Sequence, residues 1–231
     1  MSDPTQPVII PRHVGLITDG NRRWAKERGF SSLEGHKKGF EAGKKIVEMA
    51  YDRGIKEFTA WAFSTENWNR SKEEIDYLME LYELWLTEFS RQFRGKDVRI
   101  RVVGQIWKVP QSLQKIIERV ESETKDNSGM VFNMALSYGG RDEITQGIKR
   151  IIEKGFKSEE ITERIISENI WLPDADVIIR TGGELRLSGF LTWQSVYSEL
   201  FFIKKYLPDF TPQDFDAILQ EYAQRQRRFG K

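Results

Sequence analysis

The chain has 231 residues, of which 39% are apolar and 31% are charged, a composition typical of a globular protein with a substantial core. Its 36 lysines and arginines nearly balance 35 aspartates and glutamates, which argues against nucleic-acid binding through bulk charge. The absence of cysteine excludes disulfides, thiolate zinc sites and thiol nucleophiles, and with two histidines a histidine-rich metal site is not expected.

The first dozen residues are polar and punctuated by proline, without the basic-then-apolar pattern of a signal peptide. We therefore expect an N-terminal tail over residues 1–12 and a single domain over residues 13–231. No apolar run approaches the roughly 20 residues that a membrane span requires. The sequence predicts a cytoplasmic protein, with peripheral membrane contact left open because 12% of its residues are aromatic.

Strands and helices alternate along the predicted domain. Short apolar runs predict strands at residues 14–18, 57–63, 98–103, 130–137, 176–180 and 199–203. Amphipathic periodicity and capping residues predict helices at residues 22–28, 33–53, 71–94, 111–125, 144–154, 158–169 and 211–227. The alternation predicts an α/β fold, a single domain with a six-stranded, mainly parallel sheet surrounded by helices.

The first strand ends in Asp19-Gly20-Asn21, followed by Arg22 and Arg23. One interpretation is an ordinary turn, in which Asp19 caps a helix and the arginines are solvated. The other is a ligand site at the carboxyl end of the strand. There Gly20 would allow close approach, the arginines would bind phosphate and Asp19 would hold a hard cation such as Mg²⁺.

Two further strands run into charged loops, at residues 64–70 and 180–188. Because the carboxyl ends of parallel strands share one edge of a sheet, we expect the three loops to meet. Pooled with Glu199, they supply four cations and four acids: Arg23, Arg70, Arg180, Arg186, Asp19, Glu66, Glu184 and Glu199. Guanidinium groups match phosphate geometry, so this set predicts a site for two diphosphates and a divalent metal.

Other chemistries lack their motifs. The chain has no Gly-x-x-x-x-Gly-Lys-Ser/Thr loop, no Gly-x-Gly-x-x-Gly after the first strand and no Gly-x-Ser-x-Gly elbow. The sequence therefore does not indicate a P-loop nucleotidase, a dinucleotide-binding protein or a serine hydrolase.

From residue 13 to residue 230 the chain resembles the cis-prenyltransferases, the undecaprenyl diphosphate synthase family. The resemblance rests on blocks in the family's order: HVGLITDGNRRWA, EGHKKG, FTAWAFSTENWNR, YGGRDEI, RTGGELRLSGFLTWQ, YSEL and RRFG. It implies a six-stranded fold in a homodimer or heterodimer, of which we expect the homodimer. The implied activity is Mg²⁺-dependent condensation of isopentenyl diphosphate with an allylic diphosphate, such as farnesyl diphosphate, to a Z-polyprenyl diphosphate.

Carried over residue by residue, the resemblance makes Asp19 the acid that handles Mg²⁺ and the allylic diphosphate, and Glu199 the second magnesium ligand. It makes His36 a contact of the same phosphates, although a core or surface histidine is the alternative. It also implies which residues surround that diphosphate: Gly20, Asn21, Arg22 and Arg23 bind it, and Trp24 lines the site.

The resemblance also implies a loop between the two substrates, in which Asn67 is the proton acceptor. The loop residues are Ser64, Thr65, Glu66, Asn67, Trp68 and Arg70. The implied pocket for the diphosphate of isopentenyl diphosphate is Arg180, Arg186, Leu187 and Ser188. Arg228 and Gly230 correspond to a terminal Arg-x-Gly that reaches the site of the partner subunit.

The chain departs from the family pattern at three positions. Ser32 stands where the family usually has an arginine for the allylic diphosphate, so we expect either substitution by Arg28 or Lys37 or an altered affinity and choice of allylic substrate. Gly189 stands where many bacterial members have asparagine. Trp85 stands in a region where long-chain enzymes often have small residues facing the product.

The helix at residues 71–94 is expected to begin with a capping box between Ser71 and Glu74. Its wide apolar stripe is either ordinary core or the wall of a lipid-shaped tunnel. If Trp85 points inward it ends the growing chain early, and if it points outward it belongs to the core.

Besides the polyprenyl diphosphate synthase, the sequence leaves three other functions: a short-chain Z-prenyl diphosphate synthase, a non-catalytic subunit of a heteromeric prenyltransferase, and a generic phosphate-binding module. Non-catalytic subunits of the family typically lose the Asp-Gly-Asn block, which this chain keeps.

Overall fold

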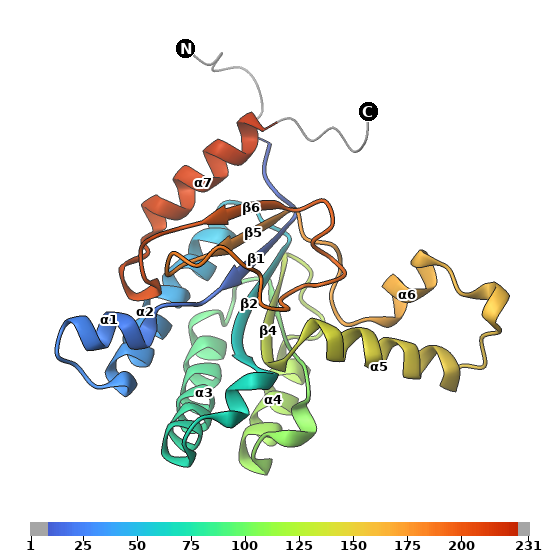
Figure 1. The fold of residues 1–231 in the computed structure, drawn as a ribbon, viewed down its shortest axis with the longest axis horizontal. Helices are drawn as coiled ribbons and strands as arrows, with labels where there is room; N and C mark the ends of the chain where they lie inside the picture. The colour runs from blue at the N-terminus through green and yellow to red at the C-terminus, as the bar shows by residue number, and fades with distance from the viewer. Residues whose placement is uncertain (1–8, 226–231) are drawn as a thin grey trace.

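The computed structural model describes residues 9–225. At its centre lies a sheet of six strands in the order β3-β4-β2-β1-β5-β6 (Figure 1). The strands are β1 (His13–Ile17), β2 (Glu57–Ser64), β3 (Val98–Val103), β4 (Met130–Tyr138), β5 (Val177–Arg180) and β6 (Glu199–Phe202). Every neighbouring pair is parallel, so the predicted α/β fold is confirmed and the sheet is parallel throughout.

Seven α-helices connect and cover the strands in the described range. They are α1 (Asn21–Glu27), α2 (Ser32–Asp52), α3 (Lys72–Gln92), α4 (Gln111–Thr124), α5 (Gly140–Glu153), α6 (Glu163–Asn169) and α7 (Pro212–Gln224). Short 3-10 turns occupy Thr65–Asn69, Ile106–Lys108, Ser158–Glu160 and Leu207–Asp209. None of the described helices is both long and apolar enough to cross a bilayer.

Two helix predictions were wrong in detail. The helix expected at residues 158–169 is a 3-10 turn followed by α6, because the Thr162 side chain accepts the Ile165 N–H at 3.3 Å and starts a new helix. Helix α5 begins at Gly140 rather than at residue 144. Asp142 and Glu143 therefore lie in its first turn, where negative charge favours the helix dipole.

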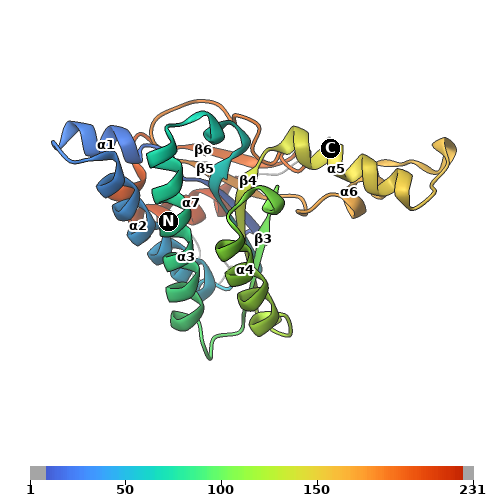
Figure 2. The ribbon, with the colours of Figure 1, turned by 90° about the horizontal axis from the view of Figure 1, so that it is seen from below.

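The two faces of the sheet are covered differently. Alternation along the strands sends Leu16 to the main core, with apolar residues of α2, α3, α4 and α7, and sends Ile17 to the opposite face. That second, smaller core is closed by residues of the segments on either side of β5, among them Leu172 and Phe190. Helices α5 and α6 project away from the sheet as an arm (Figures 1 and 2).

Neighbouring strands β1 and β5 form the point where the chain reverses its direction across the sheet. The chain leaves β1 toward β2 on one side and leaves β5 toward β6 on the other, so the loops after β1 and β5 diverge. Ile17 and Arg180 are paired in register at the ends of these two strands. Crevices at such reversal points are where open α/β sheets bind ligands.

Candidate active site

Asp19 lies at this crevice, two residues beyond β1. Its Oδ2 accepts a hydrogen bond from Nη2 of Arg180 at 2.8 Å, and its Oδ1 lies 3.3 Å from Nη2 of Arg23. Burial raises the pKa of the carboxyl, but the hydrogen bond and charge of Arg180 and the charge of Arg23 outweigh burial, and the net pKa lies below its ordinary value. Asp19 is therefore an ionised carboxylate at neutral pH.

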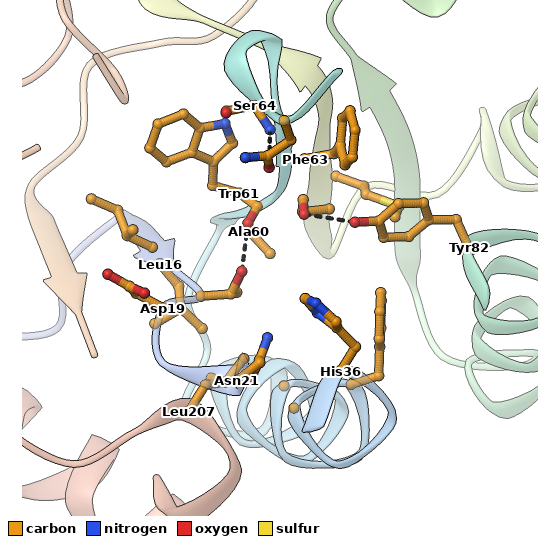
Figure 3. A pocket seen from close by; sticks show the side chains of 18 of the residues that line it. Leu16, Asp19, Asn21, His36, Ala60, Trp61, Phe63, Ser64, Tyr82 and Leu207 are labelled. Carbon is orange, nitrogen blue, oxygen red and sulfur yellow. Dashed lines mark hydrogen bonds between the residues drawn. The ribbon is translucent and has the colours of Figure 1, made fainter. Parts of the chain in front are cut away.

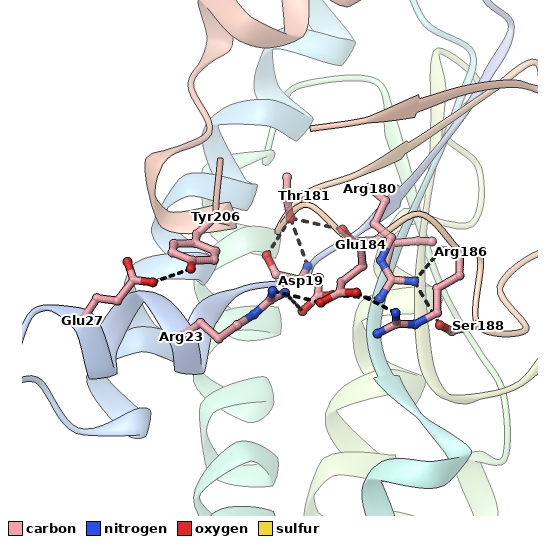
Figure 4. A network of polar contacts seen from close by, with 10 residues as sticks. Asp19, Arg23, Glu27, Arg180, Thr181, Glu184, Arg186, Ser188 and Tyr206 are labelled. Carbon is pink, nitrogen blue, oxygen red and sulfur yellow. Dashed lines mark hydrogen bonds and ion pairs between the residues drawn. The ribbon is translucent and has the colours of Figure 1, made fainter. Parts of the chain in front are cut away.

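The ion pairs continue beyond Asp19 as a chain of alternating charge (Figure 4). Glu184 bridges two arginines: its Oε1 lies 3.1 Å from Nη1 of Arg23, and its Oε2 lies 2.6 Å from Nη1 of Arg186. The sequence Arg180, Asp19, Arg23, Glu184, Arg186 thus links the loops after β1 and β5. The side chains of Arg23 and Arg186 are 41% and 60% exposed, so an incoming anion can reach both guanidinium groups.

Arg180 holds the loop after β5 against the site. Its side chain is only 6% exposed, and its Nη1 donates to the backbone carbonyl of Arg186 and, at 2.9 Å, to Oγ of Ser188. Ser188 has a left-handed backbone with φ of 53°, which costs a non-glycine residue about 1 kcal/mol or more. Backbone strain next to a buried arginine is typical of binding sites.

Gly189 also has a left-handed backbone, with φ of 88°. Glycine takes this conformation without penalty, and asparagine is among the residues that tolerate it best. Since nothing lies within 4 Å of a Cβ placed there, the loop has room for either glycine or asparagine at this position.

Glu74 of α3 contacts a second set of basic side chains. Its Oε1 accepts from Nη1 of Arg70 at 3.1 Å and from Nε2 of His36 at 3.3 Å, and lies 3.8 Å from Nε of Arg22. Burial, and then the charge of Arg70, lower the pKa of His36 to about 4 against the opposing effect of Glu74. His36 is therefore a neutral hydrogen-bond donor at neutral pH.

The expected capping box at the start of α3 is only half formed. The Ser71 hydroxyl accepts the Glu74 N–H at 3.3 Å, but the Glu74 carboxylate turns to the basic groups of α1, α2 and the loop before α3. Two ion pairs with arginines and a hydrogen bond from His36 outweigh a cap bond to one backbone N–H.

An outer pocket of about 760 Å³ opens beside Asp19, between α1, α2 and the loop before α3. Most of the polar residues that the resemblance placed on the allylic diphosphate line it, together with others that it did not name. The lining residues are Thr18, Asp19, Gly20, Asn21, Arg22, Arg23, Lys26, Gly29, Phe30, Ser32, His36 and Arg70. Gly20, with φ of 103°, is required here because a Cβ would lie 2.5 Å from the Tyr206 ring.

An inner cavity of about 250 Å³ continues from the crevice into the main core, between the sheet and helices α2 and α3 (Figure 3). Its mouth is polar and includes Asp19, His36, Asn67, Arg70 and Arg180. Its interior is apolar and is lined by Phe40, Val47, Ala60, Ala62, Phe63, Tyr82, Trp85, Phe132 and Met134. The phenol of Tyr82 is satisfied by the carbonyl of Ala62 at 2.7 Å.

Trp85 points inward. Its ring stacks on Phe89 with centroids 4.5 Å apart and lies 5.5 Å from Phe132 on β4 and 6.0 Å from Phe40 on α2. It therefore helps to close the apolar end of the cavity. The apolar stripe of α3 is at once core and cavity wall.

The loop between β2 and α3 divides its side chains among three places. Ser64, Asn67 and Arg70 line the inner cavity. Thr65 and Glu66 line a neighbouring pocket with Leu187 and Ser188. Trp68 turns away, because its indole donates to the Ser137 hydroxyl at 2.8 Å.

Asn67 is oriented by its own loop. Its Oδ1 accepts the Ser64 N–H at 3.0 Å. With its carbonyl oxygen bound to the loop, the side chain offers the NH₂ group as its free polar end at the inner cavity, which Asn67 lines.

Trp24 and Glu199 are not brought to the site. The Trp24 indole is 9% exposed and donates to Asp209 at 2.8 Å. Glu199 pairs in register with Val177, which pairs with Val14, so it lies at the amino end of the sheet, at least about 10 Å from the active-site edge at 3.3 Å per residue. There its carboxylate binds Arg225 at 2.7 Å. Arg228 and Gly230 lie outside the described residues.

Neither residue expected to substitute for an arginine at position 32 lines the outer pocket. Arg28 is paired with Asp209 at 2.9 Å and lies over the Trp24 ring, and Lys37 is exposed on α2. The cation that the sequence analysis missed is Lys26, whose signal was its position four residues after Arg22 on the same helix.

The donor set suits a magnesium ion only in part. Asp19 is an ionised, partly exposed carboxylate at the pocket mouth, but the described residues hold no group of three or more acidic or histidine ligands. Mg²⁺ commonly binds one or two carboxylates, with substrate phosphates and water completing its shell. Asp19 fits that arrangement, whereas a site made of protein ligands alone does not fit.

The fold and the site are those of an α/β protein with cation-lined pockets beside an apolar cavity. Comparison with known proteins identifies a family of enzymes to which this description applies. A family model described as "Putative undecaprenyl diphosphate synthase" matches residues 17–230. The isoprenyl transferase of Thermotoga maritima is 43% identical, covering 96% of this chain and 97% of that protein. The isoprenyl transferase of Aquifex aeolicus is 40% identical, with 96% of each chain covered.

Two solved structures share the fold. Lavandulyl diphosphate synthase from Lavandula x intermedia, in complex with dimethylallyl diphosphate, has a TM-score of 0.92 and 35% identity, covering 96% of this chain and 99% of that chain. A probable undecaprenyl diphosphate synthase from Campylobacter jejuni has a TM-score of 0.83 and 34% identity at the same coverage. The chain belongs to the cis-prenyltransferase family, that of the isoprenyl transferases and undecaprenyl diphosphate synthases.

Proposed function

We propose that the protein condenses isopentenyl diphosphate with an allylic prenyl diphosphate, such as farnesyl diphosphate, to a Z-prenyl diphosphate. The observation that carries this proposal is the meeting of two pockets and one basic loop at Asp19. The cationic outer pocket and the Arg180–Ser188 loop flank Asp19, and the apolar cavity leads away between them into the core. Two anionic head groups and one growing hydrocarbon match these surfaces.

In this assignment the allylic diphosphate occupies the outer pocket, where Arg22, Arg23, Arg70 and neutral His36 face it, and its hydrocarbon enters the inner cavity. The diphosphate of isopentenyl diphosphate binds Arg180, Arg186 and Ser188. The Asn67 amide donates to a substrate oxygen between them. Charge-assisted contacts of this kind supply both affinity and orientation.

The reaction forms one carbon–carbon bond and breaks one carbon–oxygen bond. The terminal alkene carbon of isopentenyl diphosphate attacks C1 of the allylic substrate, and diphosphate departs with the electron pair of the C1–O bond. A proton then passes from C2 of the isopentenyl unit to the released diphosphate, and the electron pair of that C–H bond forms the Z double bond. Arg23 and Arg70 stabilise the departing charge. Asp19 would hold Mg²⁺ with the diphosphate oxygens, and the metal would supply further neutralisation of that charge.

A homodimer accords with this function, because the site of one chain lacks the second acid that the resemblance implies. Glu199 lies at the opposite end of the sheet from Asp19. A second copy of the chain could supply that acid.

Product length separates two candidates within this function. The inner cavity, at about 250 Å³, is smaller than the roughly 300–1,000 Å³ typical of ligand pockets, and Trp85 helps to close its apolar end. This favours a short-chain product, whereas a long polyprenyl chain would require helix α3 to move.

The proposal is tested by incubating the purified protein with farnesyl diphosphate, isopentenyl diphosphate and Mg²⁺, omitting each in turn, and sizing the product. If product forms only when both diphosphates and Mg²⁺ are present, the result supports the proposed prenyltransferase activity. Release of no product with intact binding of both diphosphates would identify a non-catalytic subunit or a phosphate-binding module instead.

A further inference from the structure

Five basic side chains line the outer pocket, and four of them already have an acidic partner. Arg22, His36 and Arg70 share Glu74, and Arg23 is held between Asp19 and Glu184. The fifth is Lys26, in the last turn of α1. Within the described part of the chain its ammonium group makes no ion pair or side-chain hydrogen bond.

Lys26 is placed to act with Arg22. The two residues are four positions apart on α1, so their side chains project from the same face of the helix, and both line the outer pocket. Ser32, the first residue of α2, lines the same pocket with a short neutral side chain. The rim between α1 and α2 therefore carries the positive charge of Lys26, which has no ion-pair partner among residues 9–225.

We propose that Lys26 binds the diphosphate of the allylic substrate and is the main determinant of its affinity at this rim. The inference rests on the proposed function and adds a residue to it. An ammonium group binds phosphate as a point charge on a flexible stem. Unlike Arg22, Arg23 and Arg70, Lys26 loses no internal ion pair when the anion arrives.

The test compares the wild-type protein with Lys26→Met, which keeps the aliphatic stem and removes the charge. Two quantities are measured at fixed ionic strength: the Kd of inorganic diphosphate by calorimetry, and the separate KM values for farnesyl and isopentenyl diphosphate. We expect the Kd and the farnesyl diphosphate KM to rise about tenfold or more, the usual loss for a hydrogen bond to a charged group. The KM for isopentenyl diphosphate and kcat should stay within about twofold of wild type.

Lys37→Met is the matched control, since Lys37 is an exposed lysine of α2 outside the pocket lining, and it should change neither quantity. The double variant Lys26→Met/Ser32→Arg places a cation on the same rim from α2 and should recover most of the lost affinity. That recovery would exclude misfolding as the cause of the Lys26→Met effect.

The outcomes separate this inference from the proposed function. An active wild-type protein whose farnesyl diphosphate KM is unchanged in Lys26→Met would overturn the inference alone, as would a rise confined to the isopentenyl diphosphate KM. A wild-type protein that forms no product would overturn the proposed function, whatever Lys26→Met does to diphosphate binding.

Discussion

Asp19 and Arg180 join the loops that diverge from β1 and β5 through a hydrogen-bonded ion pair of 2.8 Å. Arg180 is buried and points its guanidinium both at this carboxylate and at the strained loop around Ser188. One arginine thus fixes the carboxylate beside the outer pocket and the loop assigned to isopentenyl diphosphate. Since the pKa of Asp19 is lowered, the pair stays ionised across the neutral range.

Replacing Glu74 by glutamine tests whether this carboxylate competes with the substrate. Glu74→Gln removes the negative charge shared by Arg22, His36 and Arg70 while keeping an acceptor oxygen. We expect inorganic diphosphate to bind about three- to tenfold more tightly, because two arginines no longer have to give up an ionised partner. Calorimetric titration measures the change.

Glu73→Gln, one residue away on the exposed side of α3, removes the same charge outside the pocket and serves as the control. Weaker diphosphate binding in Glu74→Gln than in this control would show that Glu74 positions the basic groups rather than competing for them.

Shortening Trp85 tests the role of the cavity floor. Because the indole helps to close the apolar end of the inner cavity, Trp85→Ala should shift the product series to longer chains. Chromatographic sizing of radiolabelled products shows the shift. Leu84→Ala alters the neighbouring residue, which is 62% exposed, and should leave the series unchanged. An unchanged series in both variants would refute the assignment of Trp85 as the limit on chain length.

The two histidines predict how stability depends on pH. Burial is the largest cause that lowers the pKa of both His13 and His36, and His36 reaches about 4. An unfolded chain binds protons near pH 6.5, which the folded protein does not accept at His36 until about pH 4. The unfolded state therefore binds more protons in this window, and the free energy of unfolding rises with pH across it.

His36→Gln removes one of these two proton-binding differences. Between about pH 4 and 6.5 the slope of unfolding free energy against pH should fall by about 1.4 kcal/mol per pH unit, the value for one proton. Urea unfolding at a series of pH values gives the slope. If the variant and the wild type show the same slope, His36 is not neutral in the folded protein.

The strand pattern predicted where the site lies, because parallel strands must place the loops after β1, β2 and β5 at one edge. That rule brought Asp19, Arg70 and Arg180 together correctly. The same rule does not bring Glu199 to that edge, because Glu199 is the first residue of its predicted strand and not the last. A residue at the start of a parallel strand belongs at the opposite edge, and the structure places it there.

The direction in which side chains point from a short helix could not be predicted from the sequence. Trp24 and Arg23 are neighbours on α1, yet Trp24 packs toward Asp209 and Arg23 faces the crevice. Which face of a seven-residue helix is buried depends on contacts with distant segments, here the turn at residues 207–209. Glu74 was likewise expected to complete a capping box with Ser71. Its contact with His36 could not be predicted, because it forms only when α2 and α3 pack together.

The central claim, prenyl transfer at the Asp19 crevice, is tested most directly by comparing wild type with Asp19→Ala. Both are incubated with farnesyl diphosphate, radiolabelled isopentenyl diphosphate and Mg²⁺, and the product is analysed for length and double-bond geometry, with circular dichroism confirming that both are folded. We predict Z-prenyl diphosphate from the wild type and no turnover from the folded variant. Normal product formation by Asp19→Ala would contradict the account.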